Sequence, residues 1–99
     1  LVTLLYEDND MHELLDVVKV MVLPAYRLQL EFENGEHRIF DMSPYMDKKP
    51  FNKLKGSPLF NCAYLDYGTV VWPGNIDIAP ETLYDRSIPT DSEYLKGSD

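Results

Sequence analysis

Cysteine is almost absent from this sequence, since Cys62 is the only one among 99 residues. One cysteine cannot close an intrachain disulfide or supply a four-cysteine zinc site. Long apolar runs are also missing: stretches such as residues 21–23 and 70–72 are far shorter than the roughly 20 residues of a membrane helix. The first residues lack the basic and apolar regions of a secretory signal. We therefore expect a soluble protein in a reducing, cytoplasmic setting, with no membrane contact.

Positive charge is scarce, with nine basic residues against seventeen acidic ones and a net charge of −8. Such a chain repels phosphates at long range, so direct nucleic-acid binding is disfavoured. The basic residues are uneven, because residues 48–65 contain no acid and carry +4, which leaves −12 for the rest. This segment is a candidate surface for an acidic partner or an anionic ligand, although surface lysines more often form a solvated loop. Its four basic residues are Lys48, Lys49, Lys53 and Lys55.

The length and composition indicate one folded domain. A chain of this size has enough apolar surface for a single core, and its 44% hydrophobic and 26% charged residues are typical of globular proteins. Changes in composition along the chain divide it into three parts. We predict an acidic N-terminal arm over residues 1–15, a single α+β domain over residues 16–86, and a polar C-terminal tail over residues 87–99.

The first half of the domain has the pattern of three strands. Residues 17–23 are rich in β-branched side chains, which favours a strand. Residues 27–33 alternate between apolar and polar side chains, as expected for a sheet with one wet face. Asn34 and Gly35 form the most favoured two-residue hairpin turn, and residues 36–41 return as the partner strand. We predict a three-stranded antiparallel meander.

Short helical segments are predicted in the middle of the chain. Ser43-Pro44 and Ser57-Pro58 each combine an N-cap residue with a proline suited to the first helical turn. Gly56 is a suitable C-cap between them. These signals predict short, irregular helical pieces rather than one long amphipathic helix.

A second hairpin is predicted in the C-terminal half. Residues 62–65 and 69–72 are its strands, and Gly68 takes the left-handed position of the three-residue loop between them. Residues 72–75 suit a type II turn, and residues 80–86 a last short helix that begins with proline. The expected fold class is α+β, a small antiparallel sheet made of the meander and this hairpin, with several short helices.

Several of these segments carry a family resemblance. The pattern comprises residues 26–28, the turn at 34–35, residues 40–44 (FDMSP), residues 67–73 (YGTVVWP) and residues 77–84 (DIAPETLY). It closely resembles the small bacterial proteins grouped as domain-of-unknown-function family 2442. The resemblance implies an α+β domain without a settled activity. Because members of that family often neighbour a small toxin-like protein, it also implies an adaptor or antitoxin-like role.

No catalytic, cofactor or metal site is predicted. His12 and His37 lack a spacing that would place two metal ligands on one helical face. Cys62 could meet His37 in a thiol triad only through the fold, and its position at a strand start favours a core role. Asp77 and Glu81 belong to a row of acids spaced by four, but a helix that begins at Pro80 leaves Asp77 in the preceding turn.

Aromatic residues are candidates for contacts with a partner, because they are enriched in cores and at interaction hot spots alike. We expect Trp72 to pack in the core and Tyr67, at a loop tip, to be exposed. Both are retained as candidate interaction residues.

The most favoured function is that of a non-catalytic protein-interaction module, an adaptor or antitoxin-like partner of a small toxin-like protein, or a homodimer. A small domain has little depth for a substrate pocket, whereas a small antiparallel sheet leaves strand edges to pair. The alternative is a small enzyme or a binder of an anionic ligand at the lysine-rich segment 48–55.

Overall fold

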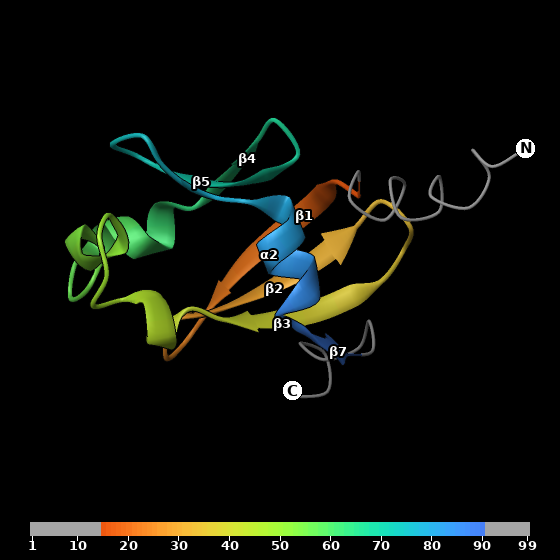
Figure 1. Cartoon of the computed structure of the whole chain (residues 1–99), viewed down its shortest axis with the longest axis horizontal. Helices are drawn as coiled ribbons and strands as arrows, with labels where there is room; N and C mark the ends of the chain where they lie inside the picture. Colours follow the sequence, from red (N-terminus) through yellow and green to blue (C-terminus); the bar gives the residue numbers. More distant parts are fainter. Residues whose placement is uncertain (1–14, 91–99) are drawn as a thin grey trace, which may run out of the picture.

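Two antiparallel sheets form the protein in the computed structural model, which describes residues 15–90 (Figure 1). The predicted meander and second hairpin are both present, but strands predominate, so the α+β prediction is confirmed only as antiparallel sheets with few, short helices. One sheet has the strand order β1-β2-β3-β7 and the other β4-β5-β6. The elements are β1 (Val17–Leu23), β2 (Arg27–Phe32), β3 (His37–Asp41), η1 (Ser43–Tyr45), η2 (Phe51–Lys53), η3 (Pro58–Cys62), β4 (Tyr64–Asp66), β5 (Thr69–Trp72), β6 (Ile76–Ile78), α2 (Pro80–Asp85) and β7 (Ile88–Thr90).

The hairpin between β2 and β3 forms as predicted, but its loop has three residues, 33–35, and not two, because Phe32 donates its N–H to the Glu36 carbonyl oxygen. Gly35 has φ +90°, which a residue without a Cβ adopts at little cost. The Asn34 Oδ1 accepts a hydrogen bond from the Glu36 backbone N–H at 3.0 Å. The resulting register buries Leu28 and Phe32 on the inner face of the sheet.

The predicted tail is wrong for residues 87–90. Residues 88–90 form β7, which pairs antiparallel with β3, with Ile88 opposite Ile39. Ser87 is buried. The local composition is typical of a coil, but the pairing depends on the β3 edge, a tertiary feature that local sequence does not encode. The rest of the tail (91–99) and nearly all of the arm (1–14) lie outside the described residues.

A third strand in the second sheet was not predicted either. Ile76 and Ile78 are buried while Asp77 between them is exposed, so Asp77 lies in β6 and not in a turn before the helix. Gly74 and Asn75 have positive φ angles of 96° and 63°, which allow the tight connection from β5.

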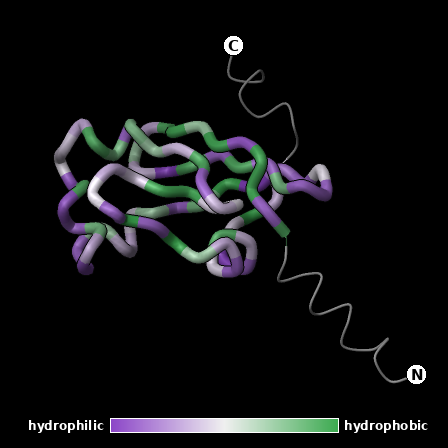
Figure 2. Tube along the Cα trace, turned by 90° about the horizontal axis from the view of Figure 1, so that it is seen from above, coloured by the Kyte–Doolittle hydropathy of each residue, from purple (hydrophilic) through white to green (hydrophobic). Residues whose placement is uncertain are grey.

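The core lies between the inner faces of the two sheets. Trp72 is fully buried, stacks on Phe60 with ring centroids 5.7 Å apart, and donates its indole N–H to the Phe60 carbonyl oxygen at 3.0 Å. Figure 2 shows hydrophobic residues along the packed strands and more hydrophilic ones in the loops. The fully buried large side chains include Trp72, Phe32, Phe40, Leu28, Leu30, Met42, Met46, Leu54, Leu83 and Val70.

The helical predictions had mixed outcomes. Ser57 caps η3 as predicted, because its Oγ accepts the Leu59 N–H at 3.1 Å. Ser43 is not a cap: it lies inside η1, and Asp41 Oδ1 accepts its backbone N–H at 2.9 Å. Cys62 does not begin a strand. It ends η3 and is exposed, so the predicted core role is wrong.

Candidate interaction surfaces

The lysine-rich segment 48–55 lies in and around η2, and its four lysines are exposed. Two of them already interact within the chain. The Lys55 Nζ lies 2.6 Å from Asp47 Oδ1, and this hydrogen bond raises the pKa of Lys55. The Lys48 Nζ lies 5.8 Å from the ring centroid of Tyr45. The segment therefore offers less free positive charge than its composition suggests.

The other two lysines of the segment border a hollow of about 350 Å³, which Pro50 and Asn52 complete. Within residues 15–90 no salt bridge to Lys49 or Lys53 is formed. The structure thus brings Lys49 and Lys53 together at one hollow, while Lys55 is held by an acid from outside the segment.

The two candidate aromatic residues occupy opposite environments. Trp72 is fully buried, so the prediction that it packs in the core is confirmed and its side chain has no surface to offer. Tyr67 is 94% exposed at the tip of the β4–β5 hairpin, with φ +53°. Tyr67 is therefore the aromatic residue available for an external contact.

A row of polar side chains crosses the outer face of the four-stranded sheet. The strand registers place Lys19, Glu31, His37 and Thr90 side by side on four successive strands. The Lys19 Nζ and His37 Nε2 lie 3.6 and 3.7 Å from the same oxygen, Oε1 of Glu31. The His37 side chain is only 19% exposed. The predicted two-residue turn at Asn34-Gly35 would have paired Glu31 with Arg38, so the sequence signal did not bring Glu31 and His37 together.

A second, more apolar row runs beside the first. It consists of Met21, Gln29, Ile39 and Ile88. Met21 is 51% and Ile88 69% exposed, so the row presents apolar side chains to solvent at its two ends. Large apolar side chains exposed together on one face often mark an interaction surface.

A hollow of about 420 Å³ lies where these rows reach β1. The Gln29 Oε1 and the His37 Nδ1 are buried atoms that have no hydrogen-bond partner in the described part of the chain. Buried polar atoms are normally paired, so this face has unused hydrogen-bonding capacity. The hollow is lined by Lys19, Val20, Met21, Gln29, Leu30, Glu31, His37 and Leu65.

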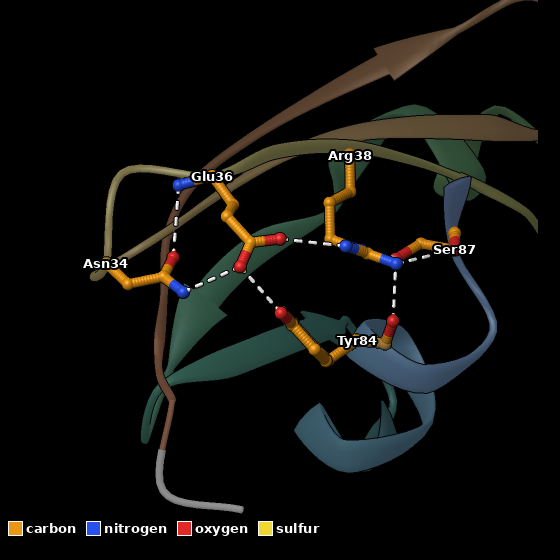
Figure 3. Close-up of polar contacts among 5 residues, drawn as sticks. All are labelled: Asn34, Glu36, Arg38, Tyr84 and Ser87. Carbon is orange, nitrogen blue, oxygen red and sulfur yellow. Dashed lines mark hydrogen bonds and ion pairs between the residues drawn. The ribbon is translucent and has the colours of Figure 1, made fainter. Parts of the chain in front are cut away.

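The densest polar cluster lies elsewhere, between the β2–β3 hairpin and α2 (Figure 3). The carboxylate of Glu36 accepts hydrogen bonds from Tyr84 Oη at 2.6 Å, Arg38 Nη1 at 2.8 Å and Asn34 Nδ2 at 2.9 Å. The Tyr84 bond is the main reason that the pKa of Glu36 is lowered, and it also raises the pKa of Tyr84.

Arg38 extends this cluster to β7. Its guanidinium lies 4.4 Å from the Tyr84 ring centroid, and it donates to the Ser87 Oγ at 2.6 Å and the Ser87 carbonyl at 2.9 Å. The Ser87 hydroxyl donates in turn to the Tyr84 carbonyl oxygen at 3.0 Å. The charged groups of the cluster therefore bind one another, so the cluster joins β3, α2 and β7 and serves the fold.

The β1 edge of the four-stranded sheet is open. Residues in a strand direct their backbone groups alternately to the two sides. Phe32 donates its N–H to Glu36 on the β3 side at 2.9 Å, so Glu31 and Gln29 direct theirs to β1. Their partners in β1 face β2, which leaves Val20 and Val22 with N–H and C=O groups directed away from the sheet.

The β7 edge is closed by its sequence. Arg38 directs its backbone groups toward Leu30 of β2, so its neighbour in β7, Pro89, directs its own groups outward. Proline has no N–H to donate, and natural sheets use it to block edge pairing. The two edges of the sheet therefore differ: β1 can accept another strand and β7 is blunted.

The described residues contain no group of three His, Cys, Asp or Glu side chains that could hold a metal ion. Over the same range, no helix has the length and apolar character needed to cross a membrane.

These features define a small two-sheet antiparallel domain in which the β1 edge of the four-stranded sheet is open. The model of a family described as protein of unknown function (DUF2442) matches residues 17–89, so the chain belongs to this family and the predicted resemblance is confirmed. No curated protein and no solved structure matches the chain.

Proposed function

We propose that this protein is a non-catalytic interaction module, an adaptor that binds a protein partner by adding a strand to β1. One observation carries the proposal: of the two edges of the four-stranded sheet, the long β1 edge is open and the short β7 edge is blunted by Pro89. Added strands gain affinity from backbone hydrogen bonds and specificity from alternate side chains. Val18 and Met21, 43% and 51% exposed, supply apolar contacts at this edge.

The net charge supports the same function. A charge of −8 orients the approach of a partner that presents a basic surface. The family resemblance adds the more specific form of the proposal, an antitoxin-like adaptor that binds a small toxin-like protein.

The test is recovery of a stoichiometric partner under native conditions. The tagged full-length protein, expressed at its natural level, is purified with its bound proteins, which are identified by mass spectrometry. Met21→Lys places a charge on the β1 edge, whereas Tyr67→Lys places the same charge on a loop that is more exposed. We expect loss of the partner from Met21→Lys and retention by Tyr67→Lys. A monomeric protein without any stoichiometric partner would disprove the proposal.

The hollow beside Lys49 and Lys53 supports a second candidate, a binder of an anionic ligand. Two lysines without a carboxylate partner in residues 15–90 favour an anion there. Titration calorimetry with pyrophosphate tests this function in the Lys49→Ala/Lys53→Ala variant, with Lys55→Ala as the matched control. Binding that is lost only in the double variant would support it, and absence of binding to the unaltered protein would exclude it for this probe.

A further inference from the structure

We propose that β1 pairs with β1 of a second copy of this chain, antiparallel and centred on Met21. This inference rests on the proposed function, since it names the strand that the open edge receives. The product is a two-fold symmetric dimer with a continuous eight-stranded sheet, in which each copy contributes β1-β2-β3-β7.

The free backbone groups of β1 limit the register. At its start, the Val17 N–H is already donated to the Gly68 carbonyl oxygen at 2.9 Å, and the pairing with β2 shifts between Val17 and Lys19. Only Val20 and Val22 then have outward N–H and C=O groups in regular strand geometry. A partner strand must match these two residues.

Of the two-fold registers centred on Lys19, Val20 and Met21, only one matches both residues. Centring on Lys19 places like charges opposite each other, which is unfavourable. Centring on Val20 pairs Val20 with its own copy and directs Val22 at Val18, within the irregular start of the strand. Centring on Met21 pairs Val20 with Val22 of the second copy and Val22 with its Val20. All four outward groups of each copy are then satisfied.

The side chains agree with the register centred on Met21. The 51% exposed Met21 side chain meets its own copy and is removed from water. Lys19 lies opposite Leu23 of the second copy, so its charge meets no like charge and its aliphatic stem covers an apolar neighbour. The apolar row from Ile88 to Met21 then continues across the dimer interface into the same row of the second copy.

Space for the second copy is present beside the strand. The 420 Å³ hollow lies beside the middle of β1, because Val20 and Met21 line it together with Leu65 of β4.

A cysteine placed at the symmetry centre tests both the dimer and its register. Facing residues of a non-hydrogen-bonded antiparallel pair have Cα atoms about 4.5 Å apart, within the usual range for a disulfide. Met21→Cys is made in a Cys62→Ser background, because Cys62 is exposed. The matched control is Lys19→Cys in the same background, whose two copies would lie about 13 Å apart along the paired strands.

We expect rapid formation of a covalent dimer by Met21→Cys under mild oxidation and none by Lys19→Cys. Light scattering of the unaltered 99-residue chain should give about twice 11.5 kDa. The mass should fall to 11.5 kDa in Met21→Lys and stay doubled in Tyr67→Lys. Circular dichroism verifies that each variant is folded.

The inference fails if the unaltered protein has a mass of 11.5 kDa at high concentration, or if the Lys19→Cys variant cross-links as fast as Met21→Cys. A monomer whose recovered partner is lost in Met21→Lys would overturn the dimer and leave the interaction module standing. A monomer without a partner would overturn both.

Discussion

Replacement of Tyr84 by phenylalanine isolates one hydrogen bond of the cluster that joins the β2–β3 hairpin to α2. The variant loses the hydroxyl that donates to Glu36 at 2.6 Å and keeps the ring that packs against Arg38 and, edge to face, against Phe32. A hydrogen bond to a charged group contributes about 1.5–3 kcal/mol. Because the Glu36 side chain is 37% exposed, solvent screening reduces the expected loss to about 1 kcal/mol.

Two measurements follow from this substitution. Thermal unfolding should show a melting temperature lower by about 4–8 °C, as expected for 1 kcal/mol in a domain of this size. In an NMR titration of the Glu36 carboxyl group, the pKa should rise toward its ordinary value of 4.5, because the bond from Tyr84 is the largest cause of its lowering.

The matched control is Tyr67→Phe, which removes a hydroxyl from a side chain that is 94% exposed. It should change neither the melting temperature nor the pKa of Glu36. If Tyr84→Phe behaves like this control in both measurements, the cluster does not stabilise the fold in the manner described.

Three further predictions concern stability. Trp72→Ala should lower the free energy of unfolding by about 3–5 kcal/mol in urea titrations, since a fully buried aromatic side chain is lost; a cost below about 1 kcal/mol would contradict its place in the core. The pKa of Glu36 is lower in the folded state, so its contribution to the free energy of unfolding is complete above the unfolded pKa of about 4.5 and is lost as the pH falls through the folded pKa. Glu36→Gln should therefore weaken the dependence of the free energy of unfolding on pH in the acid range, and an unchanged dependence would refute this. Gly35→Ala should lower the free energy of unfolding by about 1–2 kcal/mol through backbone strain at φ +90°. No steric clash adds to this cost, because nothing lies within 4 Å of the added Cβ, and an unchanged urea titration would contradict this conformation.

The sequence predicted those parts of the fold that depend on short-range signals. The turn signal at Asn34-Gly35 and the alternation through Leu28 and Phe32 were sufficient to predict the meander and its buried face. The register was not predicted, because the loop has three residues and not the expected two. Pro80 likewise marked the start of α2 at the observed residue. The signal and the structure lie within a few residues of each other in these cases.

Elements that depend on distant partners could not be predicted in this way. The strand of residues 88–90 exists because β3 presents an edge to it, and its own composition favours a coil. Cys62 has the character of a core residue, but its position at the end of η3 leaves it exposed. The environment of His37 depends on the strands that lie beside β3 in the sheet. No local feature of the sequence could therefore predict that its Nδ1 is buried.

Of the candidate site residues, the sequence placed Tyr67 and Trp72 in their observed environments. It grouped the four lysines by charge alone and could not foresee that Asp47, just before the segment, binds Lys55. Open strand edges were predicted only as a general property of small sheets. The difference between the two edges of the four-stranded sheet could not be predicted, because it depends on which strands occupy the ends of the sheet.

The position of β7 in the sheet has a consequence for synthesis of the chain. Ser87 and its partner Arg38 are 49 residues apart, so β3 emerges from the ribosome long before the strand that covers it. During this interval the nascent meander has two open edges, and the loop that must close is long, which slows the step. The four-stranded sheet can therefore be completed only after residues 88–90 have been synthesised. A chain interrupted before Ile88 would expose the β3 edge as a second site for unintended strand pairing.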